Sequence, residues 1–465
     1  MRILIGNHID PAIRDRGDLR AWTQRVVWFA REGDVVVLSD EPDKRFLTYA
    51  TSFTGVNPDG LRILVPPAGH HGGRLLDPES LTSAEFLRTV RDVLDEAGSD
   101  QVEEVFALWP SAHVSRFAAA LGVDDRFPGA GFFAQCGGEL GNNKATFRAL
   151  AAGAGVPIPA GAVCRSRREA VAATADLLAE TGTVVVKQAH NGAGVGNQLV
   201  LRDASLASDH VGARHLPPAR QRRSGGDRGV LDPALGLGLR AEPFPRRHRG
   251  VHTAHDVGVL RALRHRRRDT ADRDGPLHYV GRRLSHQVVP LRGVGQDVRE
   301  QLLRGGARLA ETYRALGYRG HLSADAIVTT TGRVVFTEVN AQVSGSLHIY
   351  QVIAHRIVGV TAAPERSVVE YHVPPTWAVA DFETFLAAVD EFGCAYDPDT
   401  RTGVIVSMPT IPLEAGRAQF VFCIAYGTDA DRQAMFDRLD SRFATVPANT
   451  YTASDHIGVP RPPAP

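Results

Sequence analysis

The chain has 465 residues and a formal net charge of +1, with 43% hydrophobic and 23% charged residues. This composition excludes a disordered or fibrous protein and argues against one built wholly around nucleic acid. The four scattered cysteines form no CxxC pair, the start turns polar after six residues, and no apolar run approaches the roughly 20 residues of a membrane span. We therefore expect a soluble, cytoplasmic protein of roughly three domains, with no zinc site and no disulfide framework.

Short apolar runs alternate with helical patterns over the first third of the chain. Strands are predicted at residues 2–6, 34–38, 62–65 and 104–108. Helices are predicted at residues 19–32 and 80–98. Strands that alternate with helices indicate a parallel sheet, so we predict a Rossmann-like α/β domain over residues 1–135.

A helix is predicted to open at Asn143 and to end near residue 154, before the Pro157–Pro159 segment. A second helix is expected at 168–180 and a strand at 183–187. A glycine-rich loop follows, then a strand at 198–201. Further on, a helix is expected at 298–316, a hairpin at 325–340, and a small α+β unit after residue 380.

Residues 203–286 differ from the rest of the chain. They hold 17 Arg and 8 of the 18 His but no Lys or Ile, and their formal charge is +8. No strand or helix periodicity is sustained there. We consider three explanations: a frameshifted translation of a GC-rich gene, a disordered basic loop, and a nucleic-acid-binding arm. The abrupt onset after residue 201 and the recovery near residue 288 favour the frameshift.

Lysine is almost absent from this chain. Of 53 basic residues only Lys44, Lys144 and Lys187 are lysine, and the others are arginine. A coding bias towards arginine removes lysine wherever charge alone matters, so a retained lysine is a candidate for a role that arginine cannot fill. Lys44 lies in a charged loop and is interpreted as incidental. Lys187 ends a strand and Lys144 opens a helix.

The glycine loop and the hairpin carry the other candidate residues. Asn191, Gly192, Gly194 and Gly196 lie between two strands, where backbone N–H groups can approach a triphosphate, although a plain structural turn is an equal alternative. Glu338 and Asn340 alternate on one strand and share a face, with Asp325 on the strand before. Hard oxygen ligands of this kind suit Mg²⁺ shared with nucleotide phosphates.

In this order, the helix opened by Asn143 and Lys144, the strand ending in Lys187, the glycine loop, and Asp325 with the Glu338-x-Asn340 motif resemble the ATP-grasp superfamily of carboxylate–amine ligases. The resemblance implies nucleotide binding by Lys144 and Lys187. It also implies Mg²⁺ ligation by Asp325, Glu338 and Asn340, and ATP and Mg²⁺ as cofactors. It covers residues 136–350, apart from the anomalous stretch, and implies that the N-terminal domain is a pre-ATP-grasp domain.

The whole-chain layout, with the runs GYRGHLSADAIV and FTEVNAQVSGSLHIY and an added domain at 351–465, resembles the pheganomycin-type peptide ligases. That implies peptide-bond formation through an acyl phosphate, in specialised-metabolite biosynthesis. The resemblance also implies catalytic roles for Lys187, Glu338 and Asn340. Ser344, Gly345 and Ser346 follow the metal ligands and are expected to hold the substrate carboxylate.

The expected partners are small-molecule carboxylates and amines or peptides, and no membrane or nucleic acid. The sequence leaves open whether the protein forms a homo-oligomer. The adenine-binding acidic residue and a phosphate-binding basic residue would fall within 203–286, where neither is recognisable. Two alternatives remain: an ATP-grasp ligase for free amino acids, and a non-catalytic nucleotide- or nucleic-acid-binding protein, such as an inactive frameshifted product.

Overall fold

A computed structural model describes residues 1–7, 19–98, 101–190, 197–202, 213–216, 240–243, 259–264, 273–280, 283–329, 331–413 and 417–445. The chain forms two compact units. The first unit combines residues 1–109 with residues 345–465, and the second comprises residues 110–344. The sequence-based division at residues 135 and 350 remains a prediction.

The first unit begins with the expected parallel sheet. Its strands β1 (Arg2–Ile5), β2 (Val35–Val37), β3 (Arg62–Leu64) and β4 (Glu104–Ala107) lie in the order β3-β2-β1-β4. All neighbours are parallel, which confirms the α/β prediction. Its helices are α1 (Arg20–Gln24), α2 (Lys44–Thr54), α3 (Pro78–Leu81) and α4 (Ala84–Ala97). The single helix expected at 19–32 is instead α1 followed by a 3₁₀ turn at Arg25–Phe29, whose side chains are mostly buried.

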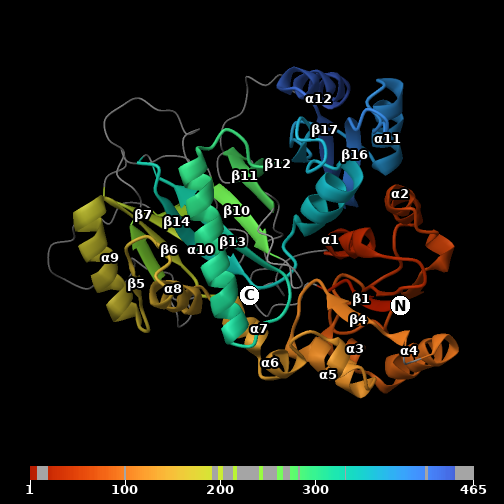
Figure 1. Cartoon of the computed structure of the whole chain (residues 1–465), viewed down its shortest axis with the longest axis horizontal. Helices are drawn as coiled ribbons and strands as arrows, with labels where there is room; N and C mark the ends of the chain where they lie inside the picture. The colour runs from red at the N-terminus through yellow and green to blue at the C-terminus, as the bar shows by residue number, and fades with distance from the viewer. Residues whose placement is uncertain are drawn as a thin grey trace, which may run out of the picture. The chain divides into compact units, whose positions relative to one another are not determined.

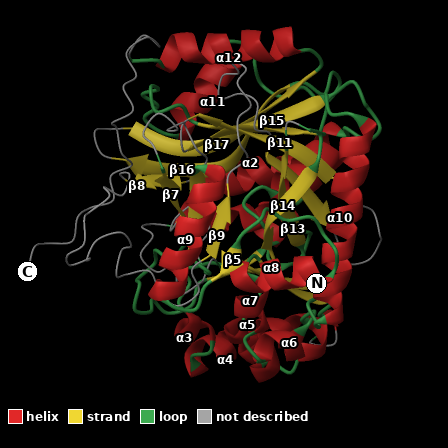
Figure 2. Ribbon diagram, turned by 90° about the vertical axis from the view of Figure 1, so that its left-hand side faces the viewer, coloured by secondary structure: helices red, strands yellow, loops and turns green. Residues whose placement is uncertain are grey.

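The C-terminal part of the first unit is α+β, as expected. A π-helix, Ile349–Val358, leads into β15 (Ser367–His372), α11 (Phe382–Glu391), β16 (Gly403–Leu413), β17 (Arg417–Tyr426) and α12 (Asp429–Phe443). The strands are antiparallel in the order β15-β17-β16. In Figure 2, α11 and α12 lie beside β17.

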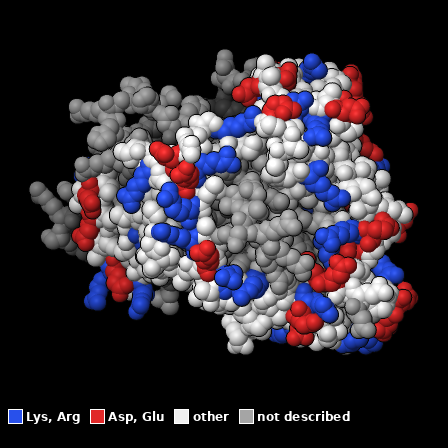
Figure 3. Space-filling model, in the orientation of Figure 1, with Lys and Arg blue, Asp and Glu red and all other residues white. Residues whose placement is uncertain are grey.

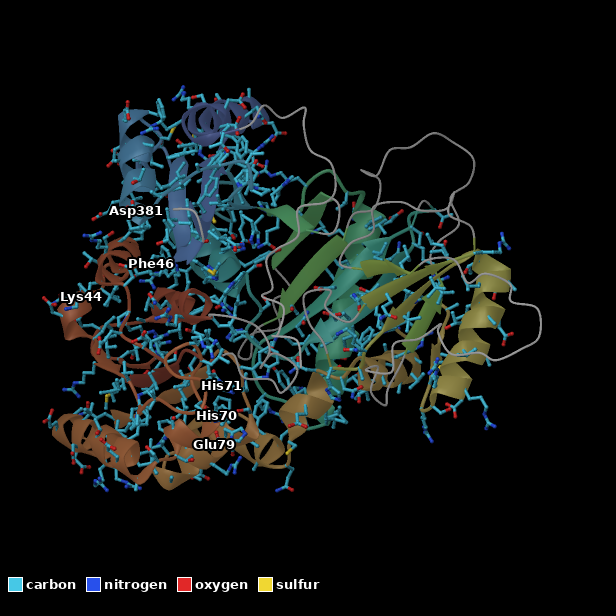
Figure 4. All side chains as sticks on the ribbon, turned by 180° about the vertical axis from the view of Figure 1, so that it is seen from behind. Lys44, Phe46, His70, His71, Glu79 and Asp381 are labelled. Atoms are coloured by element: carbon cyan, nitrogen blue, oxygen red, sulfur yellow. The ribbon has the colours of Figure 1, made fainter. Side chains whose placement is uncertain are left out.

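Aromatic side chains join the two ends of the chain into this unit. Phe46 of α2 lies edge-on to Trp28 and to Phe382 of α11. The indole Nε1 of Trp28 donates to the carbonyl of Ser407 at 2.8 Å. Lys44 lies on the exposed outer side of α2, whereas Phe46 turns inward (Figure 4). The burial of large aromatic rings favours this association of segments that are far apart in sequence.

The second unit contains a five-stranded sheet flanked by helices. Its strands β5 (Ala162–Val163), β6 (Thr183–Lys187), β7 (Asn197–Leu201), β8 (Ala213–Leu216) and β9 (Arg240–Pro243) lie in the order β5-β9-β6-β7-β8. Its N-terminal helices are α5 (Ala112–Ala120), α6 (Ala130–Ala134), α7 (Gly137–Gly141), α8 (Lys144–Gly153) and α9 (Arg167–Thr181). Helix α9 packs against β6 and β9 (Figure 1).

A second antiparallel sheet completes this unit. Strands β10 (Val259–Arg264), β11 (Arg273–Val280), β12 (Arg283–Val289), β13 (Leu322–Val328) and β14 (Val334–Asn340) lie in the order β14-β13-β10-β11-β12. Helix α10 (Gln296–Ala315) packs against β10, β13 and β14 (Figures 1 and 2). Gly305 of α10 lies so close to the Phe336 ring that a Cβ atom would collide with it. That contact identifies the face of β14 that α10 covers.

Part of the stretch 203–286 forms strands, although its sequence sustains no strand or helix periodicity. Strands β8, β9, β10, β11 and the first part of β12 lie in it. Main-chain hydrogen bonds do not depend on side-chain patterning, so strands pair here despite the irregular sequence. The frameshift hypothesis itself stays a prediction. No helix in the described part of the chain is long and apolar enough to cross a membrane.

Candidate active site

Helix α8 begins where the sequence predicted, and its start is fixed by side-chain capping. The Oδ1 atom of Asn143 accepts hydrogen bonds from the N–H groups of Ala145, at 2.8 Å, and Thr146, at 3.0 Å. An N-cap of this kind satisfies donors that the helix leaves unpaired. It places Lys144 at the first helical position, with 5% of its surface exposed.

Lys144 is also tied to the segment that follows Lys187. Its backbone N–H donates to the carbonyl of Ala189 at 2.9 Å. Lys187 is the last residue of β6 and is 9% exposed. The start of α8 and the end of β6 are therefore held together, and both carry a largely buried lysine. A buried ammonium group is costly unless an anion accompanies it.

For Lys144 that anion is the carboxylate of Glu338. The Nζ atom of Lys144 lies 3.5 Å from Oε2 of Glu338, with the two side chains 6% and 21% exposed. The pair joins α8 to β14 within the second unit. It brings together a predicted nucleotide-binding lysine and a predicted metal ligand.

The hairpin of β13 and β14 places the predicted metal ligands in register. Asp325 pairs directly with Glu338, and Ser323 pairs with Asn340. Side chains of directly opposed residues lie on the same face, roughly 5 Å apart at Cβ. Asp325, Glu338 and Asn340 therefore share one face of the sheet. Helix α10 covers the opposite face of the sheet. Phe336, which Gly305 of α10 contacts, lies on that opposite face because the pairing shifts by one residue between Phe336 and Glu338.

A β-bulge produces this register. Phe336 pairs with Ala326, and the pairing then shifts by one residue, so Glu338 rather than Thr337 lies opposite Asp325. The hydroxyl of Thr337 donates to the carbonyl of Asp325 at 3.3 Å. Bulges are frequent beside active sites because they re-aim a side chain. Here the bulge brings two carboxylates together.

The donor set is compatible with Mg²⁺. Two opposed carboxylates and one amide are hard oxygen donors, and Mg²⁺ completes such a shell with water and phosphate oxygens. Among the described residues, no group of three or more His, Cys, Asp or Glu side chains could hold a metal on its own. A site that shares its ion with a bound phosphate chain fits this donor set better than a cage made wholly of protein.

Two asparagine contacts of the site were missed by sequence reasoning. Asn142 accepts from the N–H of Ala341 at 2.9 Å, and its Nδ2 lies 3.4 Å from the Ala341 carbonyl. Asn142 thereby clamps the residue that follows Asn340. The Nδ2 atom of Asn143 lies 2.8 Å from Nε2 of His190, at the start of the glycine loop. No periodicity in the sequence points to either contact.

The predicted loop residues Asn191, Gly192, Gly194 and Gly196 lie outside the described residues. The loop is bounded by β6 and β7, which pair antiparallel with Lys187 opposite Asn197. β9 pairs with the other edge of β6, so that Glu242 lies opposite Val185. The role of the glycine loop stays a prediction.

The predicted substrate residues are divided between the two units. Ser344 ends the second unit and is 4% exposed. Gly345 and Ser346 belong to the first unit, where Gly345 lies beside the Trp22 ring and the Ser346 carbonyl accepts from the N–H groups of Ile349 and Tyr350. Their role in substrate binding stays a prediction. His348 is fully buried, and burial together with the nearby charge of Arg25 holds its pKa well below the usual range.

Comparison with known proteins agrees with this architecture. Residues 23–123 match the family model described as the Pre ATP-grasp domain. No curated protein sequence matches the chain.

Among solved structures, the ADP complex of purK, an N5-carboxyaminoimidazole ribonucleotide synthetase, is similar with a TM-score of 0.54 and 12% identity, over 94% of this chain and 95% of that chain. L-amino acid ligase from Bacillus licheniformis has a TM-score of 0.51 and 12% identity, over 95% and 97% of the two chains. N5-carboxyaminoimidazole ribonucleotide synthetase from Thermus thermophilus has a TM-score of 0.52 and 13% identity, over 96% and 99%. These likenesses show the ATP-grasp fold.

Proposed function

We propose that this protein is an ATP-dependent ligase that joins a carboxylate to an amine through an acyl phosphate. The observation that carries the proposal is the arrangement around Glu338. The Lys144 ammonium lies 3.5 Å from its carboxylate, and Asp325 lies opposite it in the hairpin. One ammonium group and two carboxylates in one partly buried site suit a nucleotide triphosphate with its metal.

In the first step, a carboxylate oxygen of the substrate attacks the γ-phosphorus of ATP, the bond to the bridging oxygen breaks, and ADP leaves. Phosphoryl transfer requires alignment and charge neutralisation more than covalent help from the protein. Lys144 and Lys187 supply ammonium groups to the phosphate oxygens. Asp325, Glu338 and Asn340 would hold Mg²⁺, which, when bound, offsets the charge of the phosphates.

In the second step, the amine attacks the acyl carbon, inorganic phosphate leaves, and the amine loses a proton. The largely buried surroundings of the two lysines limit water, which would otherwise hydrolyse the acyl phosphate. We assign this exclusion to the second unit, where Lys144, Lys187 and Ser344 are each at most 9% exposed.

The finer proposal is a peptide ligase of specialised metabolism, in which the acceptor is an amino acid or a peptide. The runs at 317–328 and 336–350 support it by their resemblance to the pheganomycin-type ligases. L-amino acid ligase, which is similar to this chain in fold, is named for L-amino acids. The acceptor class is therefore the first property to measure.

The test is ADP release from ATP and Mg²⁺ by the full chain, with pools of amino acids and of peptides as substrates. Release that requires both an acid and an amine supports a ligase, and mass spectrometry of the product separates peptide from amino-acid acceptors. ATP turnover that is independent of any acid, or binding of DNA with a steep salt dependence and no turnover, would contradict the proposal. On the face drawn in Figure 3, the acidic and basic side chains of the described residues are interspersed.

A further inference from the structure

Two buried serine hydroxyls in this protein donate to a carbonyl. Ser115 donates to Ala130 at 3.0 Å, and Ser407 donates to Val421 at 3.1 Å. Ser323 differs from both. It is fully buried, yet its Oγ atom has no hydrogen-bond partner in the described part of the chain. A buried hydroxyl without a partner is unfavourable, so its presence requires a reason.

The position of Ser323 supplies that reason. It pairs with Asn340 across the hairpin and lies two residues before Asp325 on the same strand. Alternate residues of a strand share a face. Ser323 therefore lies on the face of Asp325 and Glu338, one cross-strand pair further towards the loop that follows β14.

Two other unpartnered polar atoms lie in that loop. The hydroxyl of Ser344, which is 4% exposed, and the Oε1 atom of Gln342 also have no partner among the described residues. Thr174, Tyr313 and Gln287 also have unpartnered side-chain atoms, but they belong to α9, α10 and β12 and not to this group. Three unpaired polar side chains beside the metal ligands indicate a bound group that pairs with them.

We propose that the hydroxyl of Ser323 donates a hydrogen bond to the phosphoryl group that passes from ATP to the substrate carboxylate. This inference rests on the proposed function and adds a residue to the same site. Lys144 and Lys187 supply charge, whereas Ser323 supplies a hydroxyl donor whose oxygen is held in place by the sheet. Hydrogen bonds to an anionic oxygen are stronger than those between neutral groups, so such a bond compensates for burial of the hydroxyl.

The experiment compares Ser323→Ala with the matched control Ser115→Ala in the full chain. The melting temperature Tm without ligand and the affinities for MgADP, and for inorganic phosphate in the presence of MgADP, are measured. For Ser323→Ala we expect an unchanged or higher Tm, because no bond is lost, together with unchanged MgADP affinity. Phosphate affinity should fall about 10- to 100-fold. Ser115→Ala should lower Tm by about 2–4 °C and leave both affinities unchanged.

Equal phosphate affinity in Ser323→Ala and the wild type would overturn the inference about Ser323 but not the proposed function. The same holds if Ser323→Ala lowers Tm as much as Ser115→Ala does, since the hydroxyl would then have a structural partner. A wild-type chain that binds MgADP but not phosphate also contradicts the role of Ser323. A wild-type chain that binds no MgADP overturns the proposed function, and the inference with it.

Discussion

The ammonium of Lys144 lies 3.5 Å from the carboxylate of Glu338. Without nucleotide, each of these largely buried groups neutralises the other. A divalent cation on Glu338 and a phosphate beside Lys144 would replace that pairing by two others of the same kind. The ion pair therefore keeps both charges stable in the protein before the substrate arrives.

Replacing Glu338 by Ala should reduce MgATP-dependent ADP formation by a factor on the order of 10² to 10³, because the metal loses a carboxylate and Lys144 loses its partner. Initial rates over a range of Mg²⁺ concentrations measure the effect. Glu103→Ala, at an exposed position in the first unit, is the control and should behave as the wild type. Unchanged turnover in Glu338→Ala would refute the metal assignment.

Lys187→Arg should be nearly as damaging as Lys187→Ala, with both losing activity by a factor on the order of 10². A planar guanidinium does not replace a compact ammonium in a site where the side chain is 9% exposed. Lys44→Arg is the matched control, since Lys44 is exposed on α2 and its replacement should have no effect. Full activity in Lys187→Arg would remove the argument from lysine retention. Melting temperatures of all three variants separate unfolding from loss of function.

Asn142→Ala should lower kcat about tenfold, because a small displacement of the residue after Asn340 misplaces a metal ligand. It should also cost about 1–3 kcal/mol of stability, since the N–H of Ala341 loses its acceptor. Steady-state kinetics and urea unfolding measure the two effects. Asn57→Ala, which removes an exposed cap from a short turn, is the control. Wild-type kcat in Asn142→Ala would show that the clamp does not position the site.

The first unit should lose stability as the pH falls below about 6.5. Burial lowers the pKa of His372 to about 4 and holds that of His348 well below its usual range. In that window the unfolded chain binds protons that the folded chain does not, so the stability contributed by the neutral rings is present above the unfolded pKa of about 6.5 and is lost towards the folded pKa.

For each of the two histidine rings, the free energy of unfolding falls by at most about 1.4 kcal/mol per pH unit. Urea unfolding of the wild type and of His372→Phe at pH 7.5 and pH 5 measures it. The variant should show a smaller difference between the two pH values than the wild type. An equal difference would mean that His372 does not contribute to the loss.

Resequencing the gene tests the frameshift hypothesis for residues 203–286. We expect two compensating frame changes that bound this stretch, and a corrected reading frame with fewer Arg and His residues. A single clean frame would contradict the hypothesis. If the frame changes are present, ADP release by the corrected protein should exceed that of the present chain, because the corrected stretch can supply the missing nucleotide contacts.

Much of this protein followed from its sequence. The parallel sheet was visible in short apolar runs separated by helical patterns, and the four strands at 2–6, 34–38, 62–65 and 104–108 were confirmed. The start of α8 was visible because Asn143 is a good N-cap. Lys144, Lys187 and Glu338 were proposed from residue type and local pattern, which depend only on neighbours along the chain, and their roles stay a prediction.

Other properties arose only from tertiary structure. The bulge at Thr337 decides that Glu338 lies opposite Asp325, and strand alternation alone cannot predict a shift of register. The packing of residues 345–465 against residues 1–109 depends on aromatic contacts between distant segments. The clamp of Asn142 on Ala341 and the unpaired hydroxyl of Ser323 are likewise relations between residues that are remote in sequence. Residue types and periodicity determined which groups are present, and only the packing of distant segments decided which of them meet.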